Sequence, residues 1–479
     1  MRHKALKIWL LVCALVCGRA WAQPDAPVTR RALLVGCDAF ITHENTAPSA
    51  RMNVERMARM LQSDARGYAS IAREDQGIPD REYLENAVQT AFDGADDNDI
   101  SLIYLCTHGL YDRISYEPLL VLSDGKKEDS LSAASLKQML DAVPGRKILI
   151  LDACNSGAFI DRGARGNGNL FAGSEYLVLT SAGAYENSFL WHDRQVAGGS
   201  YFAQELCEGL RTGAFDLNAD GTVTMEEARL GLLEYHGAST AQLYPLQSGE
   251  ALYVYDPARP DTSERPISDL ALDSALLTGG EDTLYFSFTV QRPVRVQYQL
   301  IYYRGGQWRF DTPQLVEDQE NAEGALTPGR KQRAVTLVTE DEAAAGYALL
   351  QIVVQEGRYA MLAGSRLISV QPDDGDPGLA VWCGGACDAE RGQEASLYVR
   401  HAFPCSLTVR ILDAEGGLVR RLAYKNSSRP LGERQDGSFF YWDGRDAAGN
   451  AVPAGEYTAE ITCRVGEITY SQAVPVRAE

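Results

Sequence analysis

Two residues in this sequence, His108 and Cys154, have the types that nucleophilic cysteine catalysis requires. Cys154 follows the apolar run "KILILDA", and His108 stands in a His-Gly turn after the apolar run "DISLIYLCT". A cysteine attacks only as its thiolate, whose ordinary pKa is about 8.5, so it needs a neighbouring histidine or a local positive potential. Of the 6 histidines in the chain, only His108 stands in such a turn at the end of a predicted strand. The pair is therefore a candidate nucleophile and base.

The elements that position this pair alternate along residues 29–256. Apolar strands such as "RRALLVG", "DISLIYLC", "KILILD" and "EYLVLT" are separated by segments of helical period such as "SARMNVERMARMLQSD", "REYLENAVQTAF" and "SAASLKQMLDAV". Continuous apolar strands between helices predict a mostly parallel sheet with helices on both faces. In such sheets the ligand crevice lies beyond the carboxyl ends of the strands. Asp38, His108 and Cys154 each fall at such an end.

Each of the two catalytic candidates also has a simpler interpretation. Alone, His108 could be a loop histidine and Cys154 a buried thiol, but together at two strand ends of one sheet they predict a catalytic dyad. Gly109 allows the backbone to come close to a substrate. Its N–H, together with that of Cys154, would bind a developing oxyanion.

The motifs "LIYLCTHG" and "LILDACNSGAF", which place His108 and Cys154 46 residues apart, resemble the His-Gly and Asp-x-Cys-x-Ser-Gly motifs of the caspase-like cysteine peptidases. That clan includes caspases, metacaspases, clostripain and gingipains. The resemblance covers about residues 29–256, including "LLVGCDAF" and "VLTSAG". It implies that Cys154 attacks the scissile carbonyl, and that His108 protonates the leaving amine and then activates water.

The charge of the pocket predicts the specificity. Asp152 stands where caspases have the Gln of Gln-Ala-Cys, and Asp38 stands where the family has a second pocket residue. Two carboxylates without a compensating Arg favour a protein or peptide substrate with Arg or Lys at P1. The alternative is that Asp152 only orients its loop. Asn155 after the nucleophile and Asn53-Val54 on the first helix depart from the family pattern. An inactive caspase-like scaffold that acts through its β-sandwich modules is therefore the alternative function.

The segment "DLNADGTVTMEE" at 216–227 matches the calcium loop of an EF-hand, between helical segments "SYFAQELCEGLR" and "MEEARLGLLEYH". Gly221 would make the sharp turn. A single copy inside another domain could also be kept as a plain turn. The chemistry of the dyad requires no cofactor. The ligands that the pattern predicts for Ca²⁺ are Asp216, Asn218, Asp220, Thr222, Thr224 and Glu227.

Beyond the first domain the pattern changes to short alternating strands without helices. It predicts one β-sandwich module at 265–372 and a second, Ig-like one at 380–479. "YWDGRDAAGNAVPAGEYT" in the second resembles the Ig-like domain of the flagellar-hook capping protein. Such a module could bind a surface or a protein partner, or serve as a spacer. Cys405 and Cys463 lie on its predicted strands, where a disulfide could join them.

The first 22 residues read as a signal peptide, with a basic start, the apolar "IWLLVCALVCG" and "AWA" before a cut after Ala22. We therefore expect an exported protein; Cys13 and Cys17 leave a lipoprotein as a less favoured alternative. No later run reaches the ~18 apolar residues of a membrane span. The net charge of −20 argues against a nucleic-acid partner. Arg162 and Arg165, in the Gly-rich loop after the nucleophile, predict self-cleavage there.

Overall fold

The structure is a computed structural model, and it describes residues 28–46, 49–112, 115, 117–161, 169–193, 196–235, 239–256, 266–278, 283–304, 307–318, 324–337, 346–356, 359–372, 375–427 and 437–479. The predicted signal peptide at 1–22 and the predicted cleavage residues Arg162 and Arg165 lie outside this part of the chain. Among the helices described, none is long and apolar enough to cross a membrane.

A six-stranded sheet forms the centre of the first domain. All neighbouring strands in it run parallel, except that β12 pairs antiparallel with β8 at one edge. The predicted mostly parallel α/β sheet is therefore confirmed. Across the sheet the order is β12 (Gln242–Tyr244), β8 (Tyr176–Thr180), β7 (Arg146–Asp152), β3 (Ile100–Cys106), β1 (Arg30–Gly36) and β2 (Ser70–Glu74).

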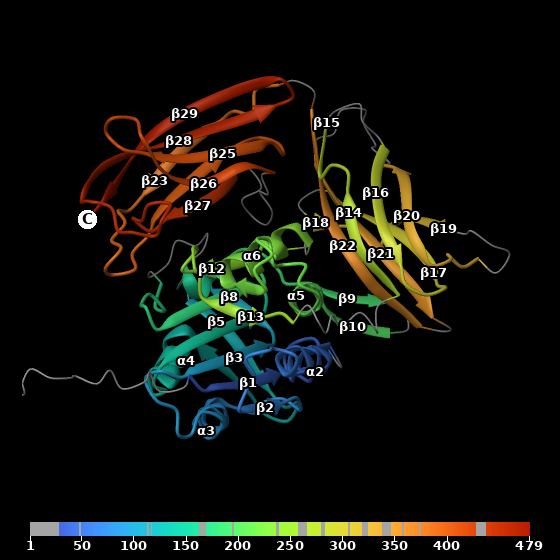
Figure 1. Cartoon of the computed structure of the whole chain (residues 1–479). Helices are drawn as coiled ribbons and strands as arrows, with labels where there is room; N and C mark the ends of the chain where they lie inside the picture. The colour runs from blue at the N-terminus through green and yellow to red at the C-terminus, as the bar shows by residue number, and fades with distance from the viewer. Residues whose placement is uncertain are drawn as a thin grey trace, which may run out of the picture.

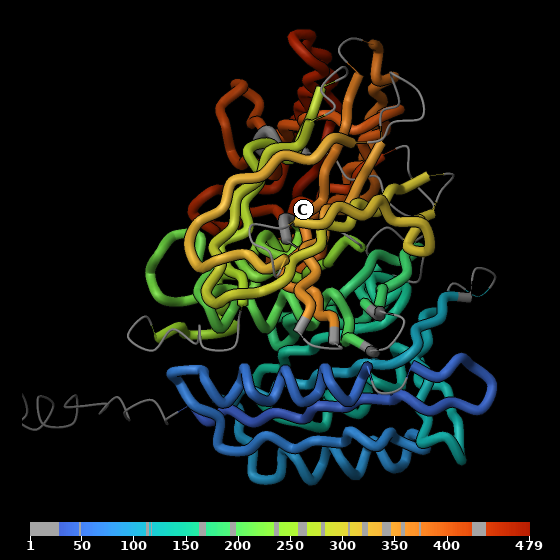
Figure 2. The backbone as a smooth tube through the Cα atoms, turned by 90° about the vertical axis from the view of Figure 1, so that its right-hand side faces the viewer, coloured from blue at the N-terminus to red at the C-terminus, as the bar shows by residue number. Residues whose placement is uncertain are grey.

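Helices cover both faces of this sheet, and Figure 2 shows α2 and α3 on opposite sides of the first strands. Successive side chains of β1 point to opposite faces: Ala32 and Leu34 belong to one core, Leu33 and Val35 to the other. Burial on both faces explains why the strands are continuously apolar. The first core contains α2 (Ser49–Gln62), α5 (Tyr201–Thr212) and α6 (Met225–Tyr235), and the second contains α3 (Arg81–Ala91) and α4 (Ala133–Asp141).

Short elements surround the carboxyl ends of the parallel strands. An antiparallel three-stranded sheet follows β3 directly, and a short 3-10 helix, η1 (Ser156–Ile160), follows β7. A hairpin after β8 leads into α5. At the opposite, amino ends of the strands, β13 pairs with β11, which is part of the predicted calcium loop, and Glu250 just before β13 pairs with Arg146 at the start of β7. These elements are β4 (Gly109–Asp112), β5 (Glu117–Ser123) and β6 (Glu128–Ser132); β9 (Leu190–Asp193) and β10 (Val196–Ser200); β11 (Thr222–Thr224) and β13 (Ala251–Val254).

The described residues of the middle module form strands in two sheets that enclose one apolar core, with Phe286, Phe288 and Leu350 among its buried residues. One sheet has the order β14 (Ile267–Leu272), β16 (Thr283–Val290) and β20 (Gly329–Thr336). The other has the order β15 (Leu276–Thr278), β22 (Tyr359–Gln371), β21 (Gly346–Glu356), β17 (Arg295–Arg304) and β18 (Gln307–Trp308), with β19 (Gln314–Asp318) also paired to β17.

The last module is likewise all β, and the fully buried Trp442 packs at its centre. Its sheets are β23 (Ala380–Gly384), β24 (Ala395–Arg400) and β27 (Gly437–Trp442); and β26 (Leu418–Ser427), β25 (Ser406–Leu412), β28 (Gly455–Val465) and β29 (Ile468–Ala478). Figure 1 shows both all-β modules on the same side of the first domain, with the β9–β10 hairpin reaching the middle module.

Candidate active site

His108 and Cys154 share one cleft because their strands are neighbours. β3 and β7 pair in register, with Cys106 opposite Asp152, so each candidate lies two residues beyond a paired strand end. The cleft has a volume of about 90 Å³, and both residues line it, with Asp152, Ser188 and other residues. The structure therefore brings the predicted nucleophile and base together, as the parallel sheet requires.

The ring of His108 is held by a backbone carbonyl. Its Nε2 lies 2.7 Å from the carbonyl oxygen of Glu44, and its ring packs 4.5 Å from the ring of Phe40. A carbonyl only accepts hydrogen bonds, so Nε2 carries the proton and Nδ1 remains the unprotonated nitrogen of the neutral ring. The contact thus selects the tautomer in which Nδ1 can act as a base. Sequence reasoning missed Glu44, since a backbone carbonyl leaves no signal in the residue type.

The loop that carries Glu44 is fixed by the carboxylate of Glu128 at the start of β6. This carboxylate accepts hydrogen bonds from the N–H of Ile41 (2.7 Å), the N–H of Thr42 (3.2 Å) and the Thr42 hydroxyl, and it lies 3.2 Å from Nδ1 of His43. The bond from the Thr42 hydroxyl, followed by that from Ile41, lowers the pKa of Glu128 to about 2. Glu128 is therefore ionised throughout the neutral range, and it anchors the loop on which the position of His108 depends.

The thiol of Cys154 is half-buried and donates a hydrogen bond of 3.6 Å to the carbonyl oxygen of Ser188. Burial raises the pKa of this thiol above its ordinary value, and the nearby charge of Asp152 raises the pKa further. Both effects disfavour the thiolate. A nucleophilic Cys154 would therefore need a base to take its proton, and His108 lines the same cleft.

The residue after the nucleophile has a conformation that explains its type. Asn155 is in the left-handed region, with φ of 57°, which asparagine tolerates better than most residues. Its side-chain amide donates to the carbonyl of Ala184 (2.9 Å), and its N–H donates to the carbonyl of Glu186 (2.7 Å). Asn155 thus joins the nucleophile loop to the loop after β8. The asparagine that departs from the family pattern at this position is thus a residue type that suits the tight turn.

Gly109 lies against the nucleophile loop. A Cβ atom there would meet the carbonyl oxygen of Cys154 at 1.9 Å. The N–H of Val121 donates to the carbonyl of His108, so Gly109 and Leu120 form a non-hydrogen-bonded pair between β4 and β5. The N–H of Gly109 consequently points away from β5. This orientation leaves it available as the predicted oxyanion donor.

The two predicted pocket carboxylates occupy different environments. Asp152 is only 3% exposed and lines the cleft. Its oxygens accept bonds from the hydroxyls of Tyr104 (2.8 Å), Ser188 (3.1 Å) and Ser200 (2.5 Å). Burial raises the pKa of Asp152, against the effect of these donors. Asp152 thus lines the cleft, as predicted for a substrate-binding residue. It also forms local hydrogen bonds, which is the alternative role considered for it.

Asp38 is engaged at the start of α2 instead of lining the cleft. Its carboxylate accepts bonds from the N–H groups of Ala50 (2.8 Å) and Arg51 (2.9 Å) and from the hydroxyl of Thr46 (3.0 Å). Thr46 and Ala50 themselves line the cleft. In this structure, then, Asp38 positions residues of the cleft, while Asp152 faces it.

The predicted calcium loop has the backbone of the pattern but not its full set of converging ligands. Gly221 has φ of 83°, and its N–H and that of Asp220 donate to Asp216 at 2.8 and 3.1 Å. The carboxylate of Glu227 accepts instead from the N–H and hydroxyl of Thr224, each at 2.9 Å. Within the described residues, no group of three or more His, Cys, Asp or Glu side chains is placed to hold a metal ion. Glu227 would have to leave Thr224 to take the place that the calcium pattern predicts for it.

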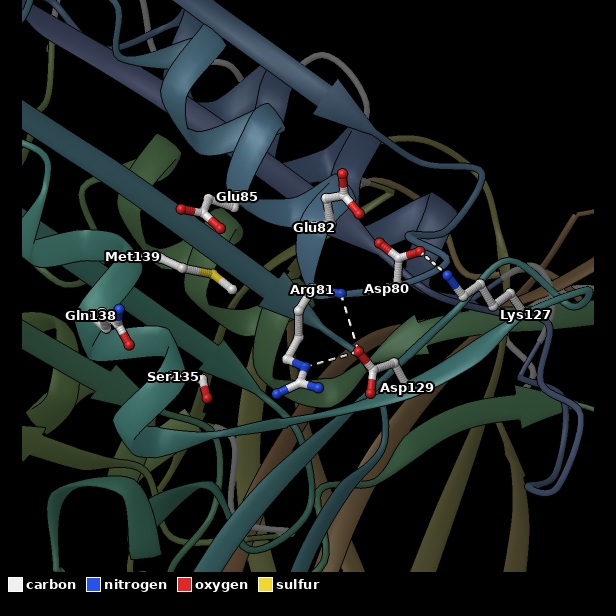
Figure 3. A pocket seen from close by; sticks show the side chains of 9 residues that line it. All are labelled: Asp80, Arg81, Glu82, Glu85, Lys127, Asp129, Ser135, Gln138 and Met139. Carbon is white, nitrogen blue, oxygen red and sulfur yellow. Dashed lines mark hydrogen bonds and ion pairs between the residues drawn. The ribbon is translucent and has the colours of Figure 1, made fainter.

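A larger hollow lies near the start of α3, and four of its charged residues form two ion pairs (Figure 3). The Nε of Arg81 lies 2.9 Å from Asp129, and Lys127 pairs with Asp80. Its residues carry neither the histidine nor the cysteine of a nucleophilic site. The small cleft between His108 and Cys154 is therefore the better candidate.

A parallel α/β sheet with a histidine and a cysteine at adjacent strand ends is the arrangement expected of a cysteine-dependent hydrolase. Comparison with protein families agrees: residues 29–235 match the caspase domain, and residues 389–466 match the FlgD Ig-like domain. The chain thus contains a caspase domain and a FlgD Ig-like domain, as the resemblances predicted. The first match indicates a cysteine peptidase, which acts on protein substrates. The comparison with curated proteins found no match.

Proposed function

We propose that the protein is an exported cysteine endopeptidase that uses Cys154 and His108 and cleaves after Arg or Lys. The observation that carries the proposal is the shared cleft, in which a carbonyl holds His108 in the tautomer of a base. The caspase domain match supports it. Asp152, a carboxylate lining the same cleft, supports the choice of a cationic P1 side chain.

The mechanism follows from the positions of these groups. Nδ1 of His108 takes the proton of the Cys154 thiol, and the sulfur attacks the scissile carbonyl carbon. The N–H groups of Gly109 and Cys154 bind the oxyanion of the tetrahedral intermediate. His108 then gives its proton to the leaving amine and takes one from the water that hydrolyses the thioester. Glu44 keeps the ring oriented through each transfer.

Peptides that differ only at P1 test this proposal. We expect P1-Arg and P1-Lys fluorogenic peptides to be cleaved, and P1-Asp and P1-Asn peptides to be left intact. A biotinylated Arg-chloromethylketone should label the wild type and not Cys154→Ala. Labelling of neither protein, with no cleavage of any peptide, would support the inactive scaffold instead. Preferred cleavage after Asp would contradict the proposed specificity.

Two further roles belong to this proposal. The loop at 216–227 would bind Ca²⁺ through the oxygens of Asp216, Asn218 and Asp220, with Glu227 joining them. The ion would hold the α5–α6 connection and take no part in the dyad chemistry. The FlgD Ig-like domain would attach the enzyme to a surface or a protein partner.

A further inference from the structure

The segment after β8 has two faces, and each belongs to a different part of the molecule. Ser188 and Leu190 line the active-site cleft. Phe189 and Trp191 instead pack into an apolar cluster made mostly of residues from the middle module. Side chains along an extended segment point alternately to opposite sides, so the segment 188–191, which leads into β9 (Leu190–Asp193), forms both part of the cleft wall and part of an interdomain core.

The interdomain cluster is aromatic and closely packed. The ring of Phe310, in the middle module, lies 5.2 Å from the ring of Phe189 and 6.1 Å from that of Tyr201. Trp308 and Tyr347 belong to the same cluster. Separation of the two domains would expose these rings to water, so their burial stabilises the contact.

Two buried hydrogen bonds cross the same interface. Nε2 of Gln351 donates to the hydroxyl of Tyr201 at 2.6 Å, and Nε2 of Gln204 donates to the carbonyl oxygen of Leu362 at 2.6 Å. Gln351 is 1% exposed. A buried amide that lost its partner would be costly, so these bonds fix the register of the two domains.

The interface connects directly to the groups that surround the nucleophile. The carbonyl oxygen of Ser188, next to Phe189, accepts a hydrogen bond from the thiol of Cys154, and the hydroxyl of Ser188 donates one to Asp152. Ser200, next to Tyr201, also donates to Asp152. Each of these serines thus has a neighbour whose ring is packed against Phe310 of the middle module.

We propose that the middle β-sandwich module is a structural part of the active site, in which Phe310 acts as a positioning residue for the 188–190 segment. Phe310 supports Phe189 from behind, and this contact sets where the carbonyl of Ser188 and the side chain of Leu190 meet the thiol and the substrate. The inference rests on the proposed peptidase function. It assigns to the middle module a role beyond that of a spacer.

The test compares Phe310→Ala with Tyr302→Ala in the full chain. Tyr302 is also a partly buried aromatic of the middle module, but it packs on the module's own core. We expect Phe310→Ala to lower kcat/KM for a P1-Arg peptide by roughly 10- to 100-fold, because small misplacements of a site are costly. Phe310→Leu should recover part of the loss. Tyr302→Ala should stay close to the wild type. An equal loss in both alanine variants would overturn the proposal, since it would reflect general destabilisation.

Hydrogen exchange supplies a readout that does not need activity. Phe310→Ala should speed exchange of the backbone amides at 188–193 and leave the amides of β3 unchanged. If the wild type cleaves no peptide, the proposed function fails while this measurement still tests the positioning role. Unchanged exchange at 188–193, or unchanged kcat/KM in an active enzyme, would overturn the inference.

Discussion

A Cβ atom on Gly109 would lie 1.9 Å from the carbonyl oxygen of Cys154, so the loops that carry the proposed base and the proposed nucleophile touch at a position that admits only glycine. The two loops come from adjacent strands, and this contact sets the spacing between them. It also places the N–H of Gly109 beside the residue whose own N–H completes the predicted oxyanion site.

Gly109→Ala should therefore abolish most of the activity while the domain still folds. The methyl group would push the two loops apart, and we expect kcat to fall by roughly 100-fold or more. Overpacking would also lower the free energy of unfolding by about 1–3 kcal/mol. Peptide cleavage and thermal unfolding measure the two effects. Gly249→Ala is the matched control, because a Cβ there meets no atom within 4 Å; full activity in Gly109→Ala would contradict the argument.

Glu128→Ala should slow catalysis from outside the cleft. The carboxylate holds the N–H groups of Ile41 and Thr42, and the same loop presents the carbonyl of Glu44 to His108. Once the loop is released, His108 loses its fixed tautomer, and we expect kcat to fall by roughly 10-fold or more while KM changes little.

The control for Glu128→Ala is the adjacent Asp129→Ala. Asp129 pairs with Arg81 on the surface hollow, which the dyad does not share (Figure 3). Its loss should leave the kcat of peptide cleavage unchanged. If both variants behaved alike, the anchoring role of Glu128 would be wrong.

The sheet, the fold class and the placement of His108 and Cys154 could be predicted from sequence because they depend on residue patterns. Continuous apolar strands identify a parallel sheet, and a parallel sheet brings the carboxyl ends of its strands to one edge. The contribution of Glu44 could not be predicted, since any residue has a carbonyl. Nor could the role of Asp38, because a carboxylate at a strand end can face a pocket or cap a helix.

The contact of the middle module with the segment beside the candidate cleft could not be predicted from the sequence either. The run "NSFLW" alternates polar and apolar residues only weakly, and nothing in it says that Phe189 and Trp191 meet another domain. Such contacts join residues more than 100 positions apart, as Tyr201 and Gln351 do with a separation of 150. The periodicity of a segment shows which of its faces is apolar, but it does not show which other part of the molecule packs on that face.

Asp152→Asn should change thiol reactivity and peptide cleavage in opposite directions. Burial and the charge of Asp152 both raise the pKa of Cys154, so removal of the charge should lower this pKa and increase the thiolate fraction at pH 7. Alkylation by iodoacetamide at pH 7 should then be faster than in the wild type. Cleavage after Arg should be slower, because the partner of the P1 cation is lost.

The pH profile of alkylation gives the sign of this effect directly. In the wild type the rate should rise with pH to a midpoint above the ordinary thiol value of about 8.5, and in Asp152→Asn the midpoint should move to lower pH. The alkylation measured in Cys154→Ala, which lacks this thiol, gives the contribution of the other cysteines. A midpoint that moved upward in Asp152→Asn would contradict the electrostatic argument.

Cys405 and Cys463 are fully buried in the last module, and their thiols are in contact. The hydrogen bond with Cys463, together with burial, raises the pKa of Cys405 far above its ordinary value. We expect the pair to form a disulfide in an oxidising compartment and to stabilise the module by about 2–4 kcal/mol. When the unreduced protein is alkylated in denaturant, mass spectrometry should show that both cysteines remain unlabelled. Labelling of both in protein prepared under oxidising conditions would refute the disulfide.

Calcium should raise the melting temperature through the loop at 216–227. At a calcium concentration a hundredfold above Kd, binding to the folded state would add about 2.7 kcal/mol to its stability. Glu227→Gln should remove most of this gain, because the twelfth position of the pattern supplies a bidentate carboxylate. Glu226→Gln, one residue earlier and not among the predicted ligands, is the matched control and should keep the gain. Calorimetry that detected no heat from calcium in the wild type, with equal melting temperatures in both variants, would show that the loop is a plain turn held by the bonds from Thr224 to Glu227.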